Sequence, residues 1–299
     1  MKKILAFILT AILAISFVGC SSKESNKESD EATKTSKEEK KVVVSGTVAL
    51  SQVLESLNVE LAGRPTTKEP ISESLKKLPE IGDPMNPDME KIKALNPDVF
   101  VSTGALKDSL GKNLEENGIK TEFYDLNSFD GVKNTIKELS QKFDKEEEGK
   151  KILDDFNTRE EKILKSIEGK EKPKVMIIFG TPGNFMLATE KSFTGDLAKK
   201  LGGENVTNAF GNAPSPYIPF NIEEALKQNP DVILRLTHVE REKSKAMFDK
   251  EFEGNKQWGN FEAVKNNKVY DLDKNYFGVT GTLKSIDALE KMSEYLYEK

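Results

Sequence analysis

Short apolar runs rich in β-branched residues alternate along the chain with stretches in which apolar residues recur every three or four positions. The amphipathic stretches predict helices, such as Val48 to Leu57 and Leu283 to Tyr297. This alternation is typical of α/β units with largely parallel sheets. The apolar runs predict strands at Asp98 to Ser102, Thr121 to Tyr124, Val175 to Phe179, Val232 to Leu236 and Val269 to Asp271.

The chain contains an internal repeat. The segment NPDMEKIKALNPDVF, which begins at Asn86, matches NIEEALKQNPDVIL, which begins at Asn221, with Asn96 aligned on Asn229 (229 − 96 = 133 residues). Each copy predicts a short helix, a turn and a buried strand, with Asn86 and Asn221 as the N-caps of the two helices. The repeat therefore predicts two similar α/β lobes.

The segment between the two copies, Phe129 to Lys172, contains no proline and carries apolar residues at heptad-like spacing among many lysines and glutamates. This pattern predicts a long solvent-exposed helix, with Gly149 as the position where it could kink or break. The expected fold is α/β, with two Rossmann-like lobes (residues 42–130 and 173–299) joined by a single long helix (residues 131–172). Such lobes leave a cleft between them, and clefts between domains are favoured ligand sites.

The N-terminal region predicts export. Lys2 and Lys3 precede an apolar run that falls short of the roughly 20 residues needed to span a bilayer, so residues 1–19 are interpreted as a secretory signal. Cys20, the only cysteine of the chain, lies in SFVGC, which resembles a bacterial lipobox whose cysteine is lipidated after cleavage. Residues 21–41 have no aromatic or large aliphatic side chain and predict a flexible tether. Together these features predict a protein anchored by lipid to the outer face of a cell membrane.

Composition argues against several classes of function. The net charge is −5, and lysines are scattered among acidic residues without a basic stripe, so no nucleic-acid partner is expected. A protein-built zinc or manganese site usually needs three or more ligands, and the chain has one histidine and one cysteine. The sequence also lacks a G-x-S-x-G elbow and a C-x-x-C-H haem-attachment motif. No nucleophile–base pair is evident, and the protein is not expected to be an enzyme.

Two residues are candidates for ligand binding. Met85 lies between Pro84 and Pro87, which hinder regular helix or sheet pairing on both sides and hold a large apolar side chain in a turn. His238, the single histidine, follows the predicted strand Val232 to Leu236, and the carboxyl ends of strands face the ligand crevice in open α/β sheets. A thioether and an imidazole on opposite sides form a known axial pair for haem iron. The plainer interpretations are a loop plug packed on the core and an incidental histidine.

Several motifs resemble a known family. The lipobox, the paired Asn-Pro-Asp-Val motifs and the central helical segment resemble the substrate-binding proteins of iron-siderophore and cobalamin ABC importers. More specifically, the chain is similar to the haem-receptor lipoproteins of this family in Gram-positive bacteria, over roughly residues 42–297. The motifs that carry this similarity are TVAL, PEIGDPMNP, TEFYDL, ATEKSFTGDLAKKLGGENV, NPDVILRLTH and FEAVKNNKVYDL.

The resemblance implies a fold of the class III periplasmic-binding-protein type, in which a helix bridges the lobes. It also implies that Met85 and His238 are the axial ligands of non-covalently bound haem (iron protoporphyrin IX), which is carried as cargo. One exposed acid in each lobe, Glu90 and Glu223, would dock an ABC permease. Surface haem-donor proteins are a further expected class of partner.

The haem propionates would need hydrogen-bond donors. The segment SGTVALSQ predicts a loop that enters a helix, where the free amides of Thr47, Val48 and Ala49 attract carboxylates. Ser102 and Thr103 are a second set of candidate donors. Aromatic residues that could pack on the porphyrin, or equally form part of the core, are Phe185, Tyr217 and Phe277.

Three alternatives remain open at this stage. A receptor for a ferric siderophore or cobalamin would have the same fold but would hold its cargo through aromatic and arginine side chains. A haem-degrading or peroxidatic enzyme would need one open axial position. A purely structural surface lipoprotein would bind no small molecule.

Overall fold

A computed structural model describes residues 41–181, 183–211, 213, 215–237 and 241–298. Cys20 and nearly all of the predicted signal and tether therefore lie outside the described residues.

The first lobe is built on a parallel four-stranded sheet. The strand order is β2-β1-β5-β6. The strands are β1 (Val43–Ser45), β2 (Leu61–Gly63), β5 (Val99–Thr103) and β6 (Thr121–Tyr124), and the helices are α1 (Val48–Ser56), α2 (Glu73–Lys76), α3 (Met89–Ala94) and α4 (Lys107–Glu116).

The second lobe has a larger, mixed sheet in the order β10-β8-β7-β11-β12, with β9 paired to β7. Strands β7, β9, β11 and β12 are parallel, whereas β8 and β10 are antiparallel to their neighbours. The strands are β7 (Lys174–Thr181), β8 (Asn184–Ala188), β9 (Glu204–Asn205), β10 (Tyr217–Pro219), β11 (Val232–Thr237) and β12 (Val269–Asp271). The helices are α7 (Phe193–Lys200), α8 (Ile222–Gln228), α9 (Arg241–Gly254), α10 (Glu262–Lys265) and α11 (Ser285–Tyr297).

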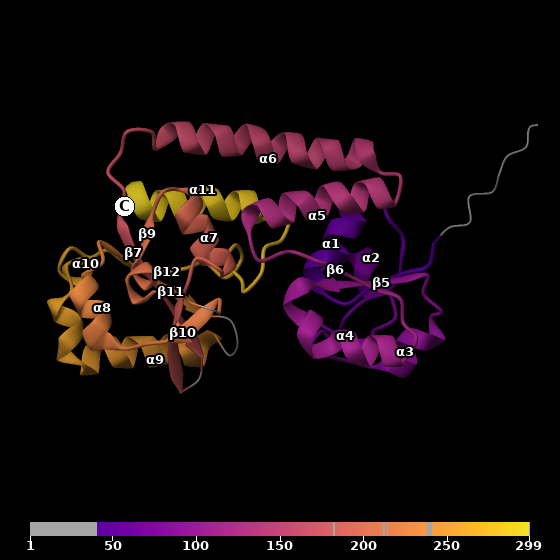
Figure 1. Cartoon of the computed structure of the whole chain (residues 1–299), viewed down its shortest axis with the longest axis horizontal. Coiled ribbons are helices and arrows are strands. Elements are labelled where there is room, and N and C mark those ends of the chain that lie inside the picture. The colour runs from indigo at the N-terminus through magenta and orange to yellow at the C-terminus, as the bar shows by residue number, and fades with distance from the viewer. Residues whose placement is uncertain (1–40, 182, 212, 214, 238–240, 299) are drawn as a thin grey trace, which may run out of the picture. The chain divides into compact units, whose positions relative to one another are not determined.

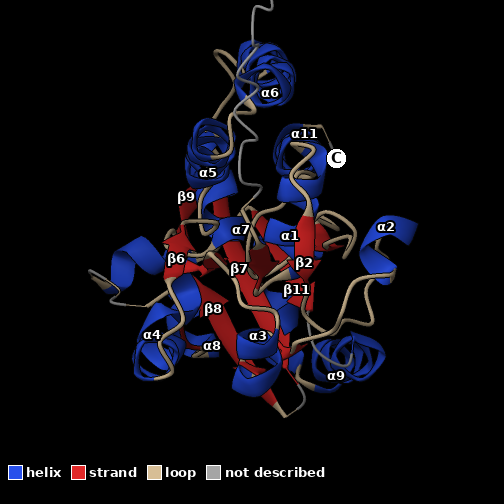
Figure 2. Cartoon of the chain, turned by 90° about the vertical axis from the view of Figure 1, so that its right-hand side faces the viewer, coloured by secondary structure: helices blue, strands red, loops and turns tan. Residues whose placement is uncertain are grey.

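Both sheets are buried on two faces, as parallel sheets usually are. Successive side chains of β7 enter different cores: Val175 and Ile177 join the largest cluster, while Met176 and Ile178 join a second one around Trp258. This is why the predicted strands read as continuous apolar runs rather than as alternating ones. Figure 2 shows the strands in the interior with helices around them.

The repeat is confirmed as a pair of equivalent helix–turn–strand units, α3 to β5 and α8 to β11. Asn96 and Asn229 occupy the same turn position and have φ values of 46° and 43°, in the left-handed region that asparagine tolerates better than most residues. Asn221 caps α8 as predicted. The prediction for Asn86 is wrong: Asp88 caps α3, because the preceding residues form a hairpin strand instead.

The connection between the lobes differs from the single helix expected over residues 131–172. It consists of two helices, α5 (Phe129–Lys142) and α6 (Glu146–Ser166), with Asp144 in the left-handed region at a φ of 55° between them. Figures 1 and 2 show α6 lying along both α5 and α11. Each helix has one apolar stripe, and the turn lets both stripes enter the largest core, where the rings of Phe129 and Phe156 lie 5.7 Å apart.

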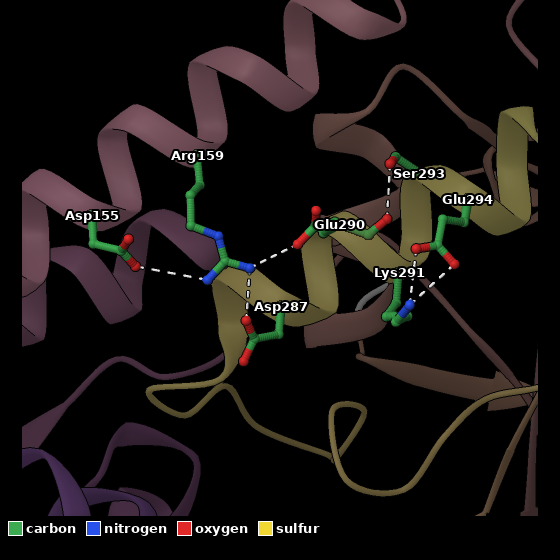
Figure 3. Close-up of polar contacts among 7 residues, drawn as sticks. All are labelled: Asp155, Arg159, Asp287, Glu290, Lys291, Ser293 and Glu294. Carbon is green, nitrogen blue, oxygen red and sulfur yellow. Dashed lines mark hydrogen bonds and ion pairs between the residues drawn. The ribbon is translucent and has the colours of Figure 1, made fainter.

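Arg159 ties α6 to α11 (Figure 3). Its Nη2 donates to Asp287 Oδ1 at 2.7 Å and to Glu290 Oε2 at 2.8 Å, and its Nη1 lies 3.7 Å from Asp155 on α6 itself. A guanidinium suits this place because its donors are fixed in a plane and reach two carboxylates at once. The connecting helix is therefore held to the last helix of the second lobe.

A second charged cluster ties α6 to α5 and α7. Glu160 accepts from Lys133 at 2.6 Å and pairs with Lys200 at 2.8 Å, and Lys200 also pairs with Asp130 at 3.0 Å. Burial alone would lower the pKa of Lys200, but the hydrogen bonds to Glu160 and Asp130 outweigh it and raise that pKa above its usual value. The three helices are thus cross-linked by these ion pairs.

No helix in the described part of the chain is both long enough and apolar enough to cross a bilayer. Neither do the described residues contain a group of three histidine, cysteine or carboxylate side chains placed to hold a metal ion.

Gly149, the position where the helical segment could kink or break, lies inside α6 and beside Ser140 of α5, and the helical segment is interrupted earlier, between Lys142 and Glu146. A Cβ there would collide with the side chain of Ser140. Gly149→Ala should therefore lower the free energy of unfolding by about 1–2 kcal/mol, since overpacking exceeds the gain in helix propensity. Gly111→Ala in α4, where the nearest atom is 3.8 Å away, should instead raise it by up to about 1 kcal/mol. Urea denaturation measures both values, and a stability gain in both variants would contradict the close approach.

Candidate functional site

The carboxyl edge of the first sheet leads into a helix N-terminus. β1 ends at Ser45, and Gly46 turns the chain directly into α1. A Cβ at Gly46 would lie 2.6 Å from Phe100 Cζ and 3.2 Å from Ser102 Oγ, so only glycine allows this tight turn across β5. The Thr47 side chain caps the Leu50 amide at 3.3 Å, which leaves the amides of Val48 and Ala49 without acceptors inside the helix.

Two buried hydroxyls end β5 beside this turn. The exposed fractions of Ser102 and Thr103 are 0% and 5%, and neither hydroxyl has a hydrogen-bond partner. Buried polar atoms are nearly always satisfied, so two consecutive exceptions point to a missing partner. The structure therefore brings Thr47, Ser102 and Thr103, which belong to two alternative sets of candidate donors, to one edge, with unused donors and a helix N-terminus suited to an anion.

Met85 lies at the tip of a small hairpin whose base is hydrogen-bonded to the chain that leaves β2 at the same edge. Strands β3 (Gly82–Asp83) and β4 (Asn86–Pro87) pair antiparallel, so Pro84 and Met85 form the two-residue loop. The Met85 amide donates to Asp83 Oδ1 at 2.8 Å. The Met85 side chain is 73% exposed, the most of any large apolar side chain in the described residues. It is therefore no plug for the core, and its sulfur is free to bind a ligand.

In the second lobe, β11 ends at Thr237, next to Gly180 of β7. His238 follows Thr237 directly in the sequence but lies outside the described residues, and its role as a ligand stays a prediction.

Of the three aromatic candidates, Tyr217 has the most informative surroundings. Its ring lies 4.6 Å from that of Phe179, and its hydroxyl is buried without a partner, which raises its pKa to about 12. The phenol therefore stays a neutral donor at physiological pH. Phe185 packs against Phe248 in the second core, and Phe277 is a core residue only 1% exposed.

Glu90 and Glu223 occupy equivalent positions in the first turns of α3 and α8, and both are exposed. Glu90 is ion-paired with Lys93, three residues further along α3, at 2.5 Å. These placements agree with the repeat offset, since 90 + 133 = 223. Each lobe thus presents an exposed glutamate at the matching position of its helix.

Comparison with known proteins shows which family has this architecture. The sequence model of the family described as periplasmic binding protein matches residues 43–276. The chain belongs to this family. Its fold is accordingly the two-lobed class III periplasmic-binding-protein fold that the sequence predicted.

Two solved structures resemble this periplasmic binding protein throughout. An ABC transporter substrate-binding protein from Listeria monocytogenes EGD-e is 36% identical, with a TM-score of 0.80 over 87% of this chain and 100% of that one. Staphylococcus aureus IsdE complexed with heme is 38% identical, with a TM-score of 0.79 over 86% of this chain and 99% of that one. Among curated relatives, the high-affinity heme uptake system protein IsdE of S. aureus strain Newman is 38% identical over 288 residues, 96% of each chain.

Sequence reasoning missed the residue that holds the Met85 hairpin. Arg64 directly follows β2, is 7% exposed, and contacts the segment that leads into the hairpin. One signal was available in the sequence: Arg64 is one of four arginines among 45 lysines and arginines, and an arginine in such a lysine-rich chain indicates a need for a planar set of donors.

The unpartnered hydroxyl of Thr103 leads to a stability prediction. Thr103→Val removes a hydroxyl without breaking a hydrogen bond, so the free energy of unfolding of the ligand-free protein should stay within about 0.5 kcal/mol or rise. The matched control is Thr135→Val, at a 2% exposed residue whose hydroxyl donates to Asp125 O at 2.9 Å. That variant should lose about 1 kcal/mol. Equal losses in chemical denaturation would show that Thr103 is satisfied within the protein.

Proposed function

We propose that this protein is an extracytoplasmic receptor that binds haem between its two lobes and delivers it to an ABC permease. The observation that carries the proposal is Met85, an exposed thioether on a hairpin beside the carboxyl edge of the first sheet. A soluble protein usually buries such a side chain, and a soft sulfur donor is a known axial ligand of haem iron. Support comes from the 38% identity to IsdE, whose crystal structure contains heme.

The residues present fit haem. The porphyrin supplies four equatorial nitrogens, so the protein needs only two axial ligands, and Met85 and His238 fill both positions. Support for His238 is its place in the sequence, directly after the last residue of β11. A filled pair leaves no coordination position open for oxygen chemistry, which suits a carrier rather than an enzyme.

We assign the haem propionates to the carboxyl edge of the first sheet, where the unused donors lie. The amides of Val48 and Ala49 and the hydroxyls of Ser102 and Thr103 are the donors there, together with the capped turn at Thr47. Tyr217 and Phe179 of the second lobe offer an aromatic surface to the ring. The neutral imidazole and these uncharged donors would hold haem without burying an unpaired protein charge.

We assign the delivery of haem to the permease to two features: the exposed glutamates Glu90 and Glu223, and the lipidated N-terminal tether. Glu90 and Glu223 would meet basic side chains of the permease, one from each lobe. Cys20 would carry the lipid, and the tether would let the body reach both the permease and surface haem donors.

A haemin titration of the purified full-length chain tests the proposal. We expect saturation at one haem per chain with a six-coordinate, low-spin absorption spectrum. Met85→Ala and His238→Ala should each change that spectrum and weaken binding by at least about tenfold, because each removes an axial ligand. Met89→Leu, a partly buried methionine near the hairpin, is the matched control and should change neither. A spectrum identical to that of free haemin would reject haem and direct the search to siderophores.

The affinity should also depend on pH. Only the neutral imidazole binds iron, so protons compete with the metal and haem should dissociate as the pH falls towards about 5. His238→Ala, which lacks the competing group, should show a flatter dependence over the same range. A spectrum unchanged down to pH 4 would contradict ligation by His238.

A further inference from the structure

The guanidinium of Arg64 is almost wholly enclosed by the segment that leads to Met85. Its Nε donates to Leu75 O at 2.7 Å, its Nη1 to Pro65 O at 2.8 Å and its Nη2 to Glu80 Oε1 at 2.9 Å. The side chain is 8% exposed. Each of the three nitrogens has an acceptor, two of them backbone carbonyls, which is a geometry that a lysine ammonium cannot reproduce.

The backbone of Arg64 holds the same segment. Its amide donates to Pro79 O at 3.0 Å, and its carbonyl accepts from the Ile81 amide at 2.9 Å. Two residues further along, the Thr66 amide donates a hydrogen bond to Gly82 O at 2.8 Å. Residues 79–82, which run directly into β3, are thus hydrogen-bonded to the chain that leaves β2.

Glu80 completes this set of hydrogen bonds, which we call the Arg64 clamp: Arg64, Thr66 and Glu80 together with residues 79–82. One carboxylate oxygen accepts from Arg64, and the other accepts from Thr66 Oγ1 at 3.0 Å. These hydrogen bonds, first that of Thr66 and then that of Arg64, lower the pKa of Glu80. Glu80 therefore stays ionised and keeps the pair closed near neutral pH.

The Met85 hairpin depends on this support. Its strands are two residues long, and hairpins of that size are not stable alone in water. The Met85 side chain is 73% exposed and so gains little position from packing. The location of its sulfur is then set by the hairpin backbone. The hydrogen bond from the Asp88 amide to Ile81 O at 2.7 Å closes the base of the hairpin, and the Arg64 clamp attaches that base to the lobe.

We propose that Arg64 is a positioning residue for Met85: by fixing residues 75–82, it holds the thioether where it can complete the coordination of haem iron. The inference rests on the proposed function, because it assigns Met85 to the metal. A metal ligand must be held within about 0.5 Å of the position from which it binds the metal. Loosening the Arg64 clamp should therefore weaken the sulfur–iron bond, although Arg64 contacts neither the sulfur nor the iron.

Arg64→Lys in the full-length chain tests the proposal, because it keeps the charge and loses the three-way contact. We expect haemin affinity to fall by about 10- to 100-fold, and the spectrum to shift towards that of Met85→Ala. Arg159→Lys is the matched control, since Arg159 is also ion-paired but contacts α11 instead of the hairpin, and it should leave the spectrum unchanged.

A double-mutant cycle separates positioning from general destabilisation. If Arg64 acts through Met85, Arg64→Lys/Met85→Ala binds haemin within about twofold of Met85→Ala alone. Additive losses would overturn the proposal, because Arg64 would then act independently of the sulfur.

Hydrogen–deuterium exchange of the ligand-free protein gives a readout without haem. Arg64→Lys should speed exchange at the Ile81 and Asp88 amides and leave the Gly149 amide in α6 unchanged. If Arg64→Lys does not fold, Glu80→Ala, at a side chain 47% exposed, loosens the same contact and should show the same changes in smaller measure. Unchanged exchange at the hairpin would overturn the clamp.

The two proposals fail differently. A wild-type chain that binds no haemin defeats the proposed function, while the exchange experiment still decides whether Arg64 holds the hairpin. A wild-type chain that binds haemin, with Arg64→Lys spectrally identical to it, defeats only the positioning role.

Discussion

The architecture depends on the packing of α6 against α5 and α11. The described strands form separate sheets in the two lobes, so the backbone ladders alone do not unite them. One apolar core does, because it contains Val43 of β1, Phe156 of α6 and Ile177 of β7 together. Around it, the carboxylates of Glu160, Asp287 and Glu290 fix the helices through lysine and arginine partners. The relation between the lobes is consequently set by close-packed helices rather than by a loose linker.

With the lobes held by these helices, the direction of the parallel strands determines where the polar groups of the candidate site lie. Parallel strands bring their carboxyl ends to one edge of a sheet, and the chain leaves that edge through turns that carry polar groups. In the first lobe these groups are the start of α1, the hydroxyls of Ser102 and Thr103, and the hairpin that follows β2. A site assembled from separate turns in this way can change its ligand without changing its core, which accounts for one fold serving several kinds of cargo.

The sequence predicted what local patterns control. The apolar and β-branched runs located β5, β6, β7, β11 and β12; the signal is strongest for β5 and β7, which are buried along nearly their whole length. The flanking prolines identified Met85 as special, and the repeat located Glu90 and Glu223. The antiparallel β8 and β10, the turn at Asp144 and the contacts of Arg64 were not predictable, because each depends on tertiary contacts rather than on a local pattern. Asn86 failed as a cap for the same reason: the hairpin competes for it with the helix.

Placing a thioether at the tip of a hairpin also exposes it to chemistry. Met85 is the one exposed methionine among the described residues, so it is the sulfur that peroxides meet first. Oxidation to the sulfoxide replaces a soft, apolar donor with a polar one, and reductases reverse the change. Iron bound to the sulfur, as proposed, would use one of its two lone pairs and make the sulfur a weaker nucleophile. A haem-loaded protein would then protect this thioether, whereas the ligand-free protein leaves it open to oxidation.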